Sequence, residues 1–87
     1  MARIGGEIEQ LAELKSVFER EASVVDELTS TIGTQLRNTA WEGPAAERFR
    51  SAWESEFKSG LTKLRSALQD AGTEVARRRD ALIEAGS

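Results

Sequence analysis

The chain has 87 residues, with 15 acidic and 12 basic side chains and a net charge of −3. This balance argues against a dedicated nucleic-acid binder, which normally carries a clear basic excess. The chain contains neither cysteine nor histidine, which excludes disulfides and the common zinc geometries. Since so short a chain buries only a marginal core by itself, association with another chain remains as the means of stabilisation.

The first half of the chain predicts one long helix over about residues 6–39. Apolar side chains recur here at spacings of three, four and seven residues. This pattern is typical of a helix that buries one face against neighbouring helices. The predicted core and pairing positions of this half are Ile8, Leu11, Leu14, Phe18, Val25, Leu28, Ile32 and Leu36.

A break at about residues 40–43 separates this helix from the second half. Pro44 is the single proline of the chain, and it suits the first turn of a helix, where its missing N–H costs nothing. It also moves Gly43 out of the helical region, and Gly43 can take a positive φ without steric cost. Trp41 therefore lies at the tip of the predicted connection. It is interpreted either as a hydrophobic cap on the turn or as a recognition residue.

The second half predicts another helix over about residues 44–84. Trp53 is interpreted as a core residue, because large aromatic side chains contribute strongly to helical cores. Gly60 is interpreted as a point of close approach between the helices, opposite Val25. The run Arg77-Arg78-Arg79 suits the negative end of the helix dipole and is interpreted as solvated. The predicted core and pairing positions of this half are Phe49, Trp53, Phe57, Leu61, Leu64, Leu68 and Val75.

These elements predict an all-α fold in which residues 1–87 form one antiparallel helical hairpin, because a short connection reverses the chain. Folding about residues 42–43 pairs positions whose numbers sum to about 85. This register places Phe18 beside Ala67 and Ile32 beside Trp53. Two helices cannot enclose a core, so the apolar stripes further predict that two hairpins dimerise into a four-helix bundle.

Enzymatic activity is not expected. Histidine, cysteine and tyrosine are all absent from the sequence, which removes most nucleophile–base and acid–base arrangements. Carboxylates such as Glu9 and Glu13 are interpreted as solvated, since a helical di-metal site also needs histidine. A glycine-rich phosphate loop is missing as well. We expect no catalytic residue, no cofactor and no bound metal.

The tripeptide Trp41-Glu42-Gly43, at the centre of a short two-helix chain, resembles the WXG family. These proteins are small ESAT-like substrates of type VII (ESX) secretion in actinobacteria and firmicutes. The resemblance extends over the whole chain in length, heptads and central turn. It includes the proline and small residues after the motif and the aromatic pair Phe49 and Trp53. It implies a helical hairpin that forms a homodimer, or a heterodimer with a sister WXG protein, and that is exported by the ESX membrane ATPase.

The C-terminal Tyr-x-x-x-Asp/Glu signal of that family is degenerate in this chain. If Asp80 is the acidic residue, the tyrosine position is occupied by Ala76. This departure favours a heterodimer whose partner carries the signal, with a homodimer as the alternative. In antiparallel packing the turn of one hairpin would lie beside the chain ends of the other. Trp41 and Gly43 are therefore expected to form half of a composite recognition site.

The N-terminal residues lack the apolar stretch of a conventional signal peptide, and no segment approaches the roughly 20 apolar residues of a membrane span. We expect a protein made in the cytoplasm and secreted without a cleaved signal peptide. The alternatives are an intracellular helical adaptor and a membrane-active effector. Acidic residues outnumber basic ones in the first helix, which argues against binding to anionic membranes.

Overall fold

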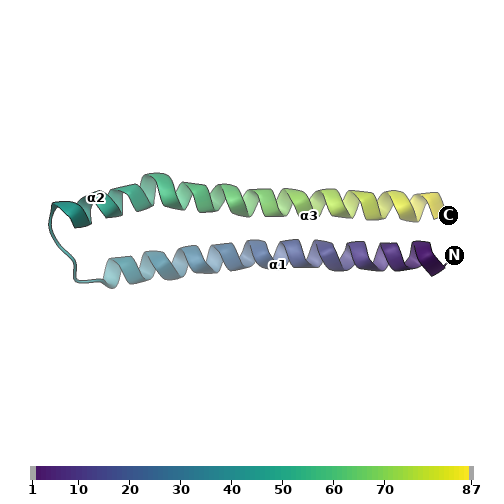
Figure 1. The fold of residues 1–87 in the computed structure, drawn as a ribbon, viewed down its shortest axis with the longest axis horizontal. Helices are drawn as coiled ribbons and strands as arrows, with labels where there is room; N and C mark the ends of the chain where they lie inside the picture. The colour runs from purple at the N-terminus through teal and green to yellow at the C-terminus, as the bar shows by residue number, and fades with distance from the viewer. Residues whose placement is uncertain (1, 87) are drawn as a thin grey trace.

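The computed structural model describes residues 2–86, with side chains from residue 5 onward, and consists of two helical arms. The first arm is α1 (Ala2–Asn38), and the second contains α2 (Pro44–Ala52), the π-helical turn η1 (Trp53–Phe57) and α3 (Lys58–Gly86). The arms lie side by side and antiparallel, with both chain ends at one end and the connection at the other (Figure 1). The predicted all-α fold with two helices packed against each other is confirmed.

The hairpin is a single layer of helices. Its extents are 65 × 17 × 12 Å, and the smallest of these is close to the diameter of one α-helix with its side chains, about 10–12 Å. Each arm is covered only by the other arm, so every remaining side of both helices faces solvent.

The chain reverses over residues 39–43. Gly43 has a φ of 111°, a conformation that side-chain-bearing residues rarely adopt. α2 begins at Pro44, and the N–H of Glu47 donates to the Gly43 carbonyl at 3.0 Å. At the other side of the connection, the Thr39 hydroxyl donates to the Gln35 carbonyl at 2.6 Å and closes the last turn of α1.

The core between the arms is small. Ala22, Val25, Ala46 and Trp53 are its buried apolar residues. Gly72 is also buried, and a Cβ on it would lie 3.3 Å from the Phe18 Cβ. This close contact between the arms is therefore made possible by a glycine.

The prediction of this close approach at Gly60 was wrong. Gly60 is exposed, and a Cβ placed on it would meet no atom within 4 Å. The glycine that the packing requires is Gly72, since any side chain there would push against the Phe18 Cβ, which cannot rotate away.

The predicted register was also wrong toward the open end of the hairpin. Phe18 lies against Gly72 instead of Ala67, a displacement of more than one helical turn. At the tip, Gly33 takes the place predicted for Ile32, because a Cβ on Gly33 would lie 3.8 Å from the Trp53 indole nitrogen.

The π-helical turn contributes to this displacement. The Lys58 N–H donates to the Trp53 carbonyl, five residues earlier, so this turn holds one residue more than an α-helical turn. Because of this extra residue, the second arm spans less of the length of α1 per residue than a continuous α-helix would. The cause is visible in the spacing of Trp53, Phe57 and Leu61, since two successive steps of four residues move an apolar stripe around an α-helix.

Candidate functional site

Arg50 fixes the connection at the tip of the hairpin. Its guanidinium donates to the carbonyls of Trp41 at 2.7 Å, Thr39 at 3.0 Å and Leu36 at 3.3 Å. These carbonyls lie in the last turn of α1 and in the connection that follows it, where carbonyls lack the regular α-helical hydrogen bond. One side chain from α2 thus holds the end of α1 and the backbone of Trp41 together.

Sequence reasoning missed this role of Arg50. The available signal was its position two turns into the second helix, where an arginine can reach back across a tight connection. Cations are favoured at helix C-termini because they bind the free carbonyls. In this chain, Arg50 of α2 binds carbonyls at the C-terminus of α1 instead of those of its own helix.

An aromatic row runs from the tip along the second arm. The ring centroids of Trp41 and Phe49 are 5.8 Å apart, and those of Phe49 and Phe57 are 6.0 Å apart. The three residues are 40%, 42% and 48% exposed, respectively. Trp41 therefore packs back onto α2 as a cap and still presents much of its ring to solvent, together with the neighbouring exposed Gly43 and Pro44.

Phe49 and Phe57 of the aromatic row belong to a larger exposed surface, which we call the apolar face. The buried residues of each arm form a line along its helix. On both arms the exposed residues of the apolar face are rotated about the helix axis away from this line in the same sense, by roughly 50–150° at the α-helical rotation per residue. Because the arms run in opposite directions and face each other, this shared sense places both stripes on the same side of the hairpin. The apolar face consists of Leu14, Val17, Val24 and Ile32 from α1 and of Phe49, Phe57 and Leu64 from the second arm.

The opposite side of the hairpin, the polar face, carries the ionic link between the arms. The Arg65 guanidinium lies 3.1 Å from the Asp26 carboxylate, and both residues are displaced from the buried line in the rotational sense opposite to that of the apolar face. The two faces of the layer therefore differ in chemistry. One carries the seven exposed apolar side chains, interrupted on α1 by the exposed Glu21 and Gln35, and the other carries the ionic link between the arms.

The predicted core and pairing residues divide between the interior and the apolar face. Val25 and Trp53 are buried, and five of the predicted residues are exposed: Leu14, Ile32, Phe49, Phe57 and Leu64. Val17 and Val24 join them on the apolar face. The half-buried remainder lines the seam between the arms and consists of Ile8, Leu11, Phe18, Leu28, Leu36, Leu61, Leu68 and Val75.

The degenerate signal positions lie far from the tip. Ala76 is half-buried and Asp80 is exposed, and Asp80 pairs with Arg79 at 3.2 Å. Glu74 pairs with both Arg77 and Arg78 at 3.0 Å. This segment belongs to the open end of the hairpin, opposite the connection that carries Trp41 (Figure 1). Within one chain the two candidate recognition elements do not meet.

Comparisons with protein-family models, curated proteins and solved structures gave no match to this chain. Within residues 2–86, no helix is long and apolar enough to cross a membrane. The same stretch holds no group of three or more acidic side chains placed to bind a metal ion. The chemistry that the site itself offers is the binding of apolar surfaces.

Proposed function

We propose that this chain is an interaction protein, one half of a pair of helical hairpins that together form a four-helix bundle. The single observation that carries the proposal is the unpartnered apolar face. The chain exposes 6471 Å² of surface, whereas a compact monomer of 9.6 kDa exposes about 5100 Å². The excess of about 1400 Å² per chain matches one partner's share of an obligate interface, which buries roughly 2000–5000 Å² in total.

A second hairpin is the occupant that this surface fits best. The apolar face runs along the hairpin and is formed by both arms, so a partner of the same shape would cover it over its length. Helix pairs of this kind pack near +20° in four-helix bundles. In an antiparallel arrangement the Trp41 tip of one chain lies beside the chain ends of the other.

We further propose that the pair is a substrate of type VII (ESX) secretion and that this chain is the co-secretion partner within it. The proposal rests on the resemblance of Trp41-Glu42-Gly43 to the WXG motif and on the exposure of Trp41 at a connection held by Arg50. The partner favoured is a sister WXG protein that carries the C-terminal tyrosine missing at Ala76, and self-pairing is the alternative. Both chains would be made in the cytoplasm and exported by the ESX membrane ATPase without a cleaved signal peptide.

Pairing is tested by mass in solution, measured by light scattering for the chain alone and mixed with a co-expressed sister hairpin. The expected result is twice the chain mass in at least one of these samples. A folded monomer in both samples would contradict the pairing proposal.

Export is tested with Trp41→Ala, and Glu42→Ala serves as the control at the neighbouring exposed position. The Trp41→Ala chain is expected to fold and pair, because the ring adds only one partly exposed contact to the tip, but to disappear from the culture medium. The Glu42→Ala chain is expected to be secreted in an ATPase-dependent manner. Normal secretion of the Trp41→Ala chain would refute the recognition role, and retention of the wild-type pair in the cell would favour the adaptor alternative.

A further inference from the structure

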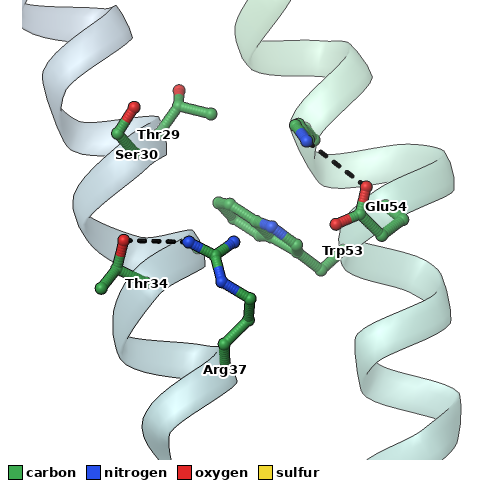
Figure 2. Close-up of a pocket in the computed structure, with 8 residues that line it drawn as sticks. Thr29, Ser30, Thr34, Arg37, Trp53 and Glu54 are labelled. Carbon is green, nitrogen blue, oxygen red and sulfur yellow. Dashed lines mark hydrogen bonds and ion pairs between the residues drawn. The ribbon is translucent and has the colours of Figure 1, made fainter.

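A cavity of about 260 Å³ opens on the polar face, near the tip, between α1 and the start of the second arm. Trp53 forms one wall, and Thr34 and Arg37 of α1 form the other (Figure 2). Trp53 is only 6% exposed, and its indole N–H has no acceptor among the side chains and backbone groups that the structure describes. Among the described residues no buried side-chain nitrogen or oxygen lacks a hydrogen-bond partner, so the unpaired indole nitrogen is itself accessible from the cavity and can donate to a group bound there.

A second donor converges on the same place. Gly33 lies between the two walls, and a Cβ on it would be 3.6 Å from Arg37 Nη1 and 3.8 Å from Trp53 Nε1. The Arg37 Nη2 donates to the Thr34 hydroxyl at 3.1 Å, which orients the guanidinium and leaves Nη1 for the cavity. Because Gly33 has no side chain, a space remains beside it, and the N–H donors of Arg37 and Trp53 border this space.

The charges around the cavity select an anion. Lys58 and Glu54, which also line it, pair with each other at 3.4 Å and largely cancel. Arg37 forms no ion pair with any acidic residue among those described, so the cavity carries one uncompensated positive charge. A guanidinium matches a planar two-oxygen acceptor in its geometry, and the indole N–H reaches the same group from the other arm.

We propose that this cavity binds a single carboxylate, held by Arg37 and Trp53 over Gly33. The cavity is slightly smaller than ordinary ligand pockets, which start near 300 Å³, so it fits a short carboxylate, either the side chain of an acidic peptide or a small free acid. The site is independent of the proposed function, because it lies on the polar face and stays open when the apolar face is covered.

The test uses the two indole N–H signals of the chain in ¹⁵N–¹H correlation spectra, since Trp41 and Trp53 are its two tryptophans. Sodium acetate is titrated against sodium chloride at constant ionic strength. The Trp53 signal is expected to move in a saturable way with acetate alone, while the Trp41 signal serves as the internal reference and stays in place. A Trp53 signal that does not move, or that moves equally with chloride, would overturn the proposal.

Variants separate binding from folding. Gly33→Ala adds a methyl group at ordinary contact distance from both nitrogens, so it fills the space of the acceptor oxygen without disturbing the fold. Gly60→Ala is the matched control, because its methyl group would meet nothing. Both changes raise helix propensity and are expected to raise the Tm, but only Gly33→Ala abolishes the acetate-dependent shift. Wild-type binding by Gly33→Ala would refute the site even if the chain pairs and is exported as proposed above.

Arg37→Gln removes the charge and is expected to weaken acetate binding at least tenfold, and unchanged binding would contradict the assignment of Arg37.

The source of the carboxylate is resolved by comparing two probes. A capped Ala-Glu-Ala peptide that binds more tightly than acetate, with no binding by its Ala-Gln-Ala counterpart, supports a partner's acidic side chain. Equal binding of the peptide and acetate supports a small free acid.

Discussion

At the scale of single residues, Arg50 determines whether the tip has a defined shape. It donates hydrogen bonds to three carbonyls of the connection and the end of α1, and hydrogen bonds from charged groups contribute more than neutral ones. Arg50→Ala is expected to lower the free energy of unfolding by about 1–3 kcal/mol, measured by urea unfolding at fixed protein concentration. Arg50→Lys is expected to recover only part of the loss, because one ammonium group cannot reproduce the guanidinium geometry.

The control for Arg50 is Arg48→Ala. Arg48 lies on the same helix and is exposed, so its removal changes the net charge by the same amount without touching the connection. An equal loss of stability in the two alanine variants would mean that the effect is one of charge and not of the hydrogen bonds at the tip.

Gly72 sets the distance between the arms. A Cβ there would lie 3.3 Å from the Phe18 Cβ and 3.7 Å from the Lys15 carbonyl oxygen, and neither atom can swing away as the end of a long side chain can. Gly72→Leu is therefore expected to separate the arms and destabilise the hairpin by about 1–3 kcal/mol. Thermal unfolding at fixed protein concentration measures this change.

Gly60→Leu is the comparison for this prediction, since Gly60 lies in the same helix with open space around it. It is expected to stabilise the chain slightly through helix propensity. If the two leucine variants unfold at the same temperature, the close approach at Gly72 does not limit the packing.

At the scale of elements, the π-helical turn η1 holds one residue in excess. Deleting Ser55, an exposed residue of that turn, is expected to convert it into an α-helical turn and leave the flanking stripes in place. Deleting the exposed Ser66 from the regular part of α3 rotates everything after it by about 100° and moves Gly72 off the interface. Circular dichroism during heating should show the Ser55 deletion within about 1 kcal/mol of the wild type and the Ser66 deletion strongly destabilised. Equal damage from both deletions would argue against an excess residue at η1.

The π-helical turn η1 also shows which part of the fold cannot be predicted from the sequence. The spacing of apolar residues predicted two packed helices, because a repeat of three and four residues suits an α-helix with one buried face. The register could not be read in the same way, since the π-helical turn and the approach at Gly72 depend on how Trp53 and Phe18 fit into the opposite arm. Every helical glycine looks alike in the sequence, so the sequence does not distinguish Gly72 from Gly60 as the point of close approach.

The candidate site, like the fold, could be predicted from the sequence only in part. The tip was marked by the glycine–proline break and by Trp41, which are local signals. The Arg50 hydrogen bonds span up to 14 residues, and the convergence of Arg37 with Trp53 joins two arms. Both arrangements depend on long-range geometry that no short pattern contains.

At the scale of the whole molecule, the layer is one helix thick, with an apolar face that its own chain cannot cover. Ile32 and Leu64 are 42% and 47% exposed and lie on opposite arms of this face. The double variant Ile32→Glu with Leu64→Glu is expected to abolish pairing, because a partner would have to bury two carboxylates without counter-ions. Sedimentation equilibrium measures the change as a loss of the doubled mass.

The control for the apolar face places the same two charges elsewhere. Ser23 and Ser59 are exposed on the arms outside the apolar face, so Ser23→Glu with Ser59→Glu gives the same net charge and leaves the face intact. This control is expected to pair like the wild type, since surface charges at this spacing are largely screened at physiological ionic strength. Pairing lost in both double variants would point to net charge as the cause. Pairing kept in both would place the contact between chains on another side of the hairpin.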